Sequence, residues 1–124
     1  MDFRSLLTDL PSGMERDLLI GEIIHSDEHV ETLLRMALHE KDPLAWRAAW
    51  LLDGSDEKKP GIADRHIPRI VKALPGLQSR GTIRSLLRML TRYRIPEKEQ
   101  GILIDLCFSY LVSELYPAIH RLSF

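Results

Sequence analysis

The 124-residue chain contains one cysteine, and only 6% of its residues are aromatic. The lone cysteine, Cys107, excludes a disulfide within the chain and is typical of proteins that work in a reducing compartment. The first residues hold no basic segment followed by an apolar one, so we expect no secretory signal peptide. The longest apolar stretch, residues 102–112, is too short to cross a membrane and contains Asp105. These absences predict a cytoplasmic protein with no membrane-spanning segment.

The sequence also lacks the short motifs on which common catalytic sites are built. It has no glycine-rich phosphate-binding loop, no serine nucleophile elbow and no HExxH zinc motif. His25 and His29 have the spacing at which one helix presents two histidines to a metal, but Ser26 between them predicts a helix boundary. We therefore expect no enzymatic activity, no bound metal and no cofactor.

What the sequence does contain is a repeat with a period of 37 residues. Segment 46–52 recurs as segment 83–89, which places Arg47 on Arg84, and a second step of the same length reaches Arg121. A parallel series of apolar positions recurs at the same spacing: Val30, Ile67 and Ile104; Leu33, Ile70 and Cys107; Leu34, Val71 and Phe108; Ala37, Leu74 and Leu111. Two apolar helical faces that recur in phase predict a stack of helical hairpins.

Capping residues and prolines indicate where the helices begin and end. The segment Ser12-Gly13-Met14-Glu15 is a capping box, and Asp42-Pro43 predicts a helix start with proline in the first turn. Gly54 is expected to end that helix, with residues 55–61 as a loop. Pro68 is expected near the start of its helix, after a short lead-in turn. The expected helices lie at 13–25, 27–38, 44–53, 62–74, 79–92 and 96–112, with a short seventh from Pro117.

These signals predict a single all-α domain over residues 1–124. We expect a right-handed α-α superhelix of about three helical hairpins, at residues 13–40, 43–75 and 79–112, with a partial fourth at 116–124. No segment alternates apolar and polar residues as a strand would, so no sheet is expected.

Several of these segments resemble a known family. Segment 42–50, Ile67-Pro68, segment 84–88 and Ile95-Pro96 resemble the HEAT-like (armadillo-type) helical repeat family of small, mostly uncharacterised bacterial proteins. The resemblance covers residues 22–112 and implies a HEAT-like solenoid. It says little about function beyond the tendency of such repeats to form long binding surfaces.

Charge is unevenly distributed along the chain, although its net value is −1. Residues 1–60 carry a net charge of −6, residues 61–94 a net charge of +7 and residues 95–124 a net charge of −2. Within the basic part, a stripe of arginines spaced by four residues runs along the predicted helix 79–92: Arg80, Arg84, Arg88 and Arg92. Such a stripe is suited to phosphates or an acidic partner. The alternative is that these arginines pair with acids of neighbouring repeats.

The two tryptophans, Trp46 and Trp50, lie one helical turn apart and are expected to pack between helices, the alternative being stacking on a ligand. Arg47 and its repeat equivalents are expected to bridge adjacent repeats through helix-end carbonyls or acids. Trp50 with Asp53 also invites comparison with HEAT-like DNA glycosylases, which use tryptophans and an aspartate in a basic groove. Those enzymes are nearly twice as long and strongly basic, so nucleic acid binding and glycosylase activity are the less favoured interpretations.

The sequence therefore predicts a non-enzymatic scaffold that binds another protein, which it does not identify. The alternative is a phosphate-ligand or nucleic-acid binder that works through the arginine stripe. A last expectation concerns the C-terminal part, which is strongly apolar although a solenoid end normally has a polar outer surface. We expect it to associate with itself as a two-fold dimer, centred on Leu111, Tyr116, Ile119 and Phe124.

Overall fold

The computed structural model describes residues 1–106 and 108–109, and this part of the chain contains helices and no strand. The elements are α1 (Phe3–Leu6), α2 (Gly13–Ile23), α3 (Asp27–His39), α4 (Leu44–Lys58), η1 (Asp64–His66), α5 (Ile67–Ala73), η2 (Leu74–Gly76) and α6 (Arg80–Leu90). A further helical segment covers residues 97–106 and 108–109. The predicted all-α class is confirmed.

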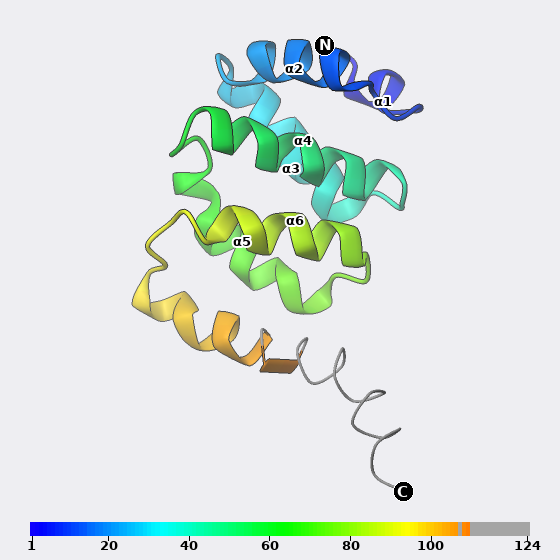
Figure 1. Cartoon of the computed structure of the whole chain (residues 1–124). Coiled ribbons are helices and arrows are strands. Elements are labelled where there is room, and N and C mark those ends of the chain that lie inside the picture. The colour runs from blue at the N-terminus through cyan, green and yellow to red at the C-terminus, as the bar shows by residue number, and fades with distance from the viewer. Residues whose placement is uncertain (107, 110–124) are drawn as a thin grey trace, which may run out of the picture.

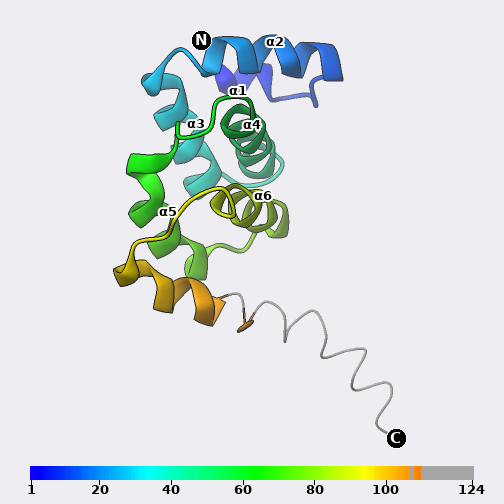
Figure 2. The same cartoon turned by 60° about the vertical axis from the view of Figure 1, so that its left-hand side comes forward.

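The helices form two stacked columns. α2, α4 and α6 lie one below another in Figure 1, and Figure 2 shows α3 and α5 as a second column beside them. The segment 97–106 lies below α5 and α6, at the opposite end of the stack from α2. The closest packing joins α4 to α3 and to α6, so α4 is the central helix of the solenoid.

Serine caps begin three of the helices at the positions that the sequence indicates. The Oγ of Ser12 accepts a hydrogen bond from the amide of Glu15 at 3.2 Å, and Glu15 accepts one from the amide of Ser12 at 3.1 Å, which completes the capping box. This contact with the Ser12 amide lowers the pKa of Glu15. Ser26 and Ser79 cap α3 and α6 in the same way. The short 3-10 turn η1 precedes α5, and Pro68 lies in the first turn of α5 as predicted.

The prediction that Gly54 ends its helix is wrong, because α4 continues through Gly54 to Lys58. Gly54 is buried within the helix, where a Cβ would collide with the guanidinium of Arg16 and would lie 2.9 Å from Cδ1 of Ile20. The glycine therefore permits the close approach of α2 to α4 rather than a helix end. Residues 55 and 56, expected in a loop, are fully buried in the last turns of α4.

The recurring apolar positions form the core, as the repeat predicts. At each of the four positions, the residues from the first two repeats are both buried: Val30 and Ile67, Leu33 and Ile70, Leu34 and Val71, Ala37 and Leu74. The third members differ. Ile104 is 66% exposed and Phe108 is 68% exposed, whereas Cys107 and Leu111 lie outside the described residues.

The tryptophans are less deeply placed than the sequence suggests. Trp46 and Trp50 are both partly exposed, with ring centroids 6.3 Å apart, and Trp50 packs against the edge of the core. Trp46 contacts α6 at Gly81, where a Cβ would lie 2.8 Å from Cβ of the tryptophan. Cβ is bonded directly to the backbone of Trp46, so no rotation of the tryptophan side chain can move it away. Gly81 therefore sets the distance between α4 and α6.

We expect Gly81→Ala to lower the free energy of unfolding by about 1–3 kcal/mol, as overpacking at a helix contact does. The matched control is Gly21→Ala in α2, where a Cβ meets nothing within 4 Å. The control should gain up to about 1 kcal/mol from its higher helix propensity. Urea unfolding of both variants measures the difference, and equal stabilisation by the two substitutions would contradict the packing of α6 on Trp46.

Candidate functional site

The arginine stripe lies on α6 and the turn that follows it, and its members have different surroundings. Arg80 and Arg84 are exposed, and Arg84 makes no ion pair within the described part of the chain. The side chain of Arg88 is 68% exposed, and its Nε lies 3.8 Å from Oδ2 of Asp53. Arg92 is only 22% exposed. The stripe therefore divides into an outward part and an inward end.

Arg92 points inward because it binds the last turns of α4. Its Nη1 lies 2.8 Å from Oδ1 of Asp53 and 3.0 Å from Oδ2 of Asp56, and its Nη2 lies 3.7 Å from Glu57. Burial lowers the pKa of Arg92, but the hydrogen bonds to Asp53 and Asp56 outweigh it and leave the pKa raised. Pairing with acids of the preceding repeat, the alternative raised by the sequence, thus describes Arg92 and more weakly Arg88.

Tyr93 completes this group, and sequence reasoning missed it. Its hydroxyl donates a hydrogen bond to Oδ1 of the fully buried Asp56. The same hydroxyl accepts hydrogen bonds from the amides of Gly61 and Ala63, at 3.2 and 3.0 Å. Burial and the hydrogen bond to Asp56 raise the pKa of Tyr93 to about 12. The separations of 36 and 37 residues from Asp56 to Arg92 and Tyr93 match the repeat period and are the signal that the sequence offered.

Arg47 joins α4 to the segment that follows α1. Nη1 of Arg47 donates to the carbonyl oxygens of Leu7 and Thr8 at 3.0 and 2.8 Å. These are carbonyls at the end of α1, as expected, but they lie before the first predicted repeat rather than in an adjacent one. Arg84, at the equivalent position, makes no such bond within the described residues, and Arg121 lies outside them. Arg47 therefore belongs to the fold, whereas Arg84 is presented at the surface.

The outer helices carry their own ion pairs between repeats. Arg69 of α5 binds Glu31 of α3 through two hydrogen bonds of 2.9 Å, and Arg65 lies 3.1 Å from Asp27. The hydrogen bond to Arg69 lowers the pKa of Glu31. His66 is buried beside them, with its Nδ1 3.7 Å from Glu31, and burial lowers its pKa. These pairs join α3 to η1 and α5 and so stabilise the stack.

The structure places the residues considered for metal binding and for glycosylase activity in packing contacts. The His29 ring packs edge-on against Phe3 at 5.4 Å, and within the described ranges no three potential ligands gather around a common point. Asp53 is buried against Arg92, and the guanidinium of Arg16 covers the Trp50 ring at 4.4 Å.

The described helices include none with the length and apolar character of a membrane span.

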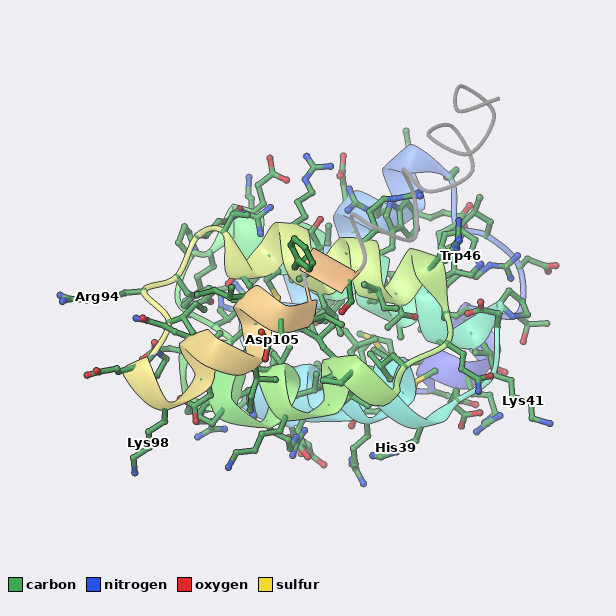
Figure 3. The ribbon with its side chains drawn as sticks, turned by 90° about the horizontal axis from the view of Figure 1, so that it is seen from below. His39, Lys41, Trp46, Arg94, Lys98 and Asp105 are labelled. Carbon is green, nitrogen blue, oxygen red and sulfur yellow. The ribbon has the colours of Figure 1, made fainter. Side chains whose placement is uncertain are left out.

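The apolar C-terminal face is the other candidate site. Ile104 and Phe108 lie one turn apart on the helical segment that begins at residue 97, and both are largely exposed. Figure 3 shows this end of the stack, with Arg94 and Lys98 projecting at one edge and Asp105 nearer the middle. The predicted self-association residues Leu111, Tyr116, Ile119 and Phe124 lie outside the described residues.

The Tyr93 contacts predict a loss of stability in alkali. An unfolded tyrosine ionises near pH 10, whereas Tyr93 in the fold ionises at about 12. The stability linked to this hydroxyl is therefore complete below pH 10 and falls as pH rises toward 12. Ultraviolet titration of the phenols and urea unfolding across this range measure the effect.

Tyr93→Phe should remove this alkaline loss and lower stability at neutral pH by about 1–3 kcal/mol, since Asp56 loses a buried donor. The exposed neighbouring variant Arg94→Gln should change stability little. An unchanged alkaline profile in Tyr93→Phe would show that another group causes the loss.

Comparison with known proteins adds one finding. A family model described as a HEAT repeat domain matches residues 4–124 of the chain. No curated protein and no solved structure matches it.

Proposed function

Since the chain belongs to the HEAT repeat domain family, we propose that it is a non-enzymatic scaffold that binds another protein in the cytoplasm. Stacked helical repeats form extended surfaces, and protein binding is the common use of such surfaces. The fold alone does not name a partner, so the proposal depends on what the surface exposes.

The observation that carries this proposal is the exposure of Ile104 and Phe108. Their equivalents in the preceding repeat, Ile67 and Val71, are buried, because the next layer of helices covers them. Burying a large apolar side chain contributes about 1.5–3 kcal/mol, so two such residues one turn apart favour binding of a protein at this face.

A second copy of the chain is the partner that this face favours. Several residues that follow Phe108 in the sequence are also apolar: Leu111, Tyr116, Ile119 and Phe124. A two-fold arrangement places the same apolar face against itself and closes after two subunits.

We expect the parent chain to form a dimer at high micromolar concentration and Phe108→Gln to weaken it. The matched control is Leu18→Gln, which removes an equally exposed apolar side chain, 69% against 68%, at the opposite end of the stack. Light scattering gives the mass of each protein. A monomeric parent chain would contradict self-association, and equal weakening by both variants would place the contact elsewhere.

A second candidate function is supported by the outward part of the arginine stripe. Arg84 is exposed without an ion pair among the described residues, and Arg88 has only a distant carboxylate. Both belong to the segment 61–94, with its net charge of +7. The candidate ligand is a phosphate group or an acidic protein segment. Nucleic acid is less favoured, because this basic strip is short and the chain as a whole is slightly acidic.

Replacing Arg84 and Arg88 together by Gln should abolish salt-dependent binding of inorganic polyphosphate or a polyglutamate peptide while leaving the melting temperature unchanged. Arg92→Gln should instead cost about 3 kcal/mol of stability, because it leaves Asp53 and Asp56 buried without their cation. Calorimetric titration and thermal unfolding separate the two effects. Undiminished binding by the double variant would rule out this candidate.

A further inference from the structure

The opposite end of the stack carries another exposed apolar face, on α2. The inner side of α2 is buried through Ile20 and Ile23. Its outer side presents Met14, which is 77% exposed, and Leu18, which is 69% exposed. The two residues are one helical turn apart, and the exposed Leu10 precedes them by the same interval. α2 forms the outermost layer of the stack in Figure 1, with no described helix beyond it.

Acidic side chains border this apolar face on both sides. With successive residues about 100° apart around a helix, Asp17 falls on one side of Met14 and Leu18, and Glu22 falls on the other. Both carboxylates are exposed, and neither makes an ion pair within the described residues. The outer face of α2 therefore combines a central apolar ridge with acidic margins.

The one basic residue of α2 does not reach this face. The guanidinium of Arg16 lies over the Trp50 ring at 4.4 Å, and its Nη2 donates to the carbonyl oxygen of Trp50 at 3.1 Å. The same side chain fills the space above Gly54, so it is held against α4. Arg16 thus stabilises the packing of α2 on α4 and leaves the acidic margins without a neighbouring cation from their own helix.

A groove of about 470 Å³ between α2 and α4 adjoins the Asp17 margin. Asp17 and Gly21 line it from α2, and Glu57 and Lys58 line it from α4. Arg16 also lines the groove, so its two basic side chains balance its two carboxylates. The groove therefore supplies space beside Asp17 and adds no net charge to the margin. Gly21 leaves room there, since nothing lies within 4 Å of where its Cβ would be.

We propose that the outer face of α2 binds an amphipathic helix with basic margins from another protein. The apolar side of that helix packs on Met14 and Leu18, and its lysines or arginines pair with Asp17 and Glu22. Such a helix adds one more layer to the column of α2, α4 and α6. Charge complementarity selects a cationic partner and repels phosphate-rich ones. This inference rests on the proposed scaffold function, and it specifies the kind of partner that binds at the α2 end of the stack.

The test uses the full chain and two fluorescent peptides of the same length. One carries leucine on one helical side and lysine on both margins, and the other has glutamate in place of every lysine. The lysine peptide should bind with an affinity that falls as salt rises. The glutamate peptide should not bind a chain in which Arg84 and Arg88 are both replaced by Gln, whereas the lysine peptide should still bind it. Met14→Gln with Leu18→Gln should weaken binding at least about tenfold, and Asp17→Asn with Glu22→Gln should weaken it and reduce its salt dependence.

The matched control is Ile104→Gln with Phe108→Gln, which removes two apolar side chains of similar exposure from the other end and should leave peptide binding unchanged. Equal binding of the two peptides to the chain without Arg84 and Arg88, no binding of the lysine peptide, or equal loss in both apolar variants would overturn the proposal. A fall in the mass of the chain itself on changing Met14 and Leu18 would also overturn it, because the occupant would then be a second copy. Self-association through Phe108 is measured separately by light scattering, so the two proposals fail independently.

Discussion

The arrangement of the second and third hairpins depends on one fully buried carboxylate, that of Asp56. Its two oxygens bind Tyr93 and Arg92 from the turn after α6, and Tyr93 in turn binds the backbone of the loop that follows α4. A buried charge without these partners would be strongly destabilising, so the position and rotation of α6 are tied to the end of α4. This contact explains why one arginine of the stripe is part of the fold while Arg84 and Arg88 remain available at the surface.

Ion pairs and hydrogen bonds between layers of the stack recur elsewhere in the fold. They occupy some of the basic side chains, whereas others stay exposed at the surface. Arg16 and Arg69 face a neighbouring repeat, where they bind a carbonyl oxygen and a carboxylate, and Arg47 binds carbonyl oxygens of the segment after α1. At the surface lie two arginines on α6, Arg84 and Arg88, and an apolar face at each end of the described stack. These surfaces support the proposed role in binding other proteins.

The sequence was sufficient to predict the helices whose signals are local. The capping box at Ser12, the lead-in turn before Pro68 and the repeated apolar positions all follow from neighbouring residues or from the repeat period. Gly54 misled the prediction because its role depends on Arg16, a residue of another helix. The roles of Arg92 and Tyr93 also depend on distant partners. Their separation from Asp56 hints at a contact, but only the packed structure distinguishes a buried pair from an exposed stripe.

A double-mutant cycle between Asp56 and Arg92 tests most directly whether this buried contact joins the hairpins. Asp56→Ala, Arg92→Ala and the double variant would be compared with the parent chain by urea unfolding. The account predicts a coupling energy of at least about 1 kcal/mol, because each single change leaves the other charge without its partner. Effects that add to within about 0.5 kcal/mol would show that the two residues act independently and would contradict the central role given to Asp56.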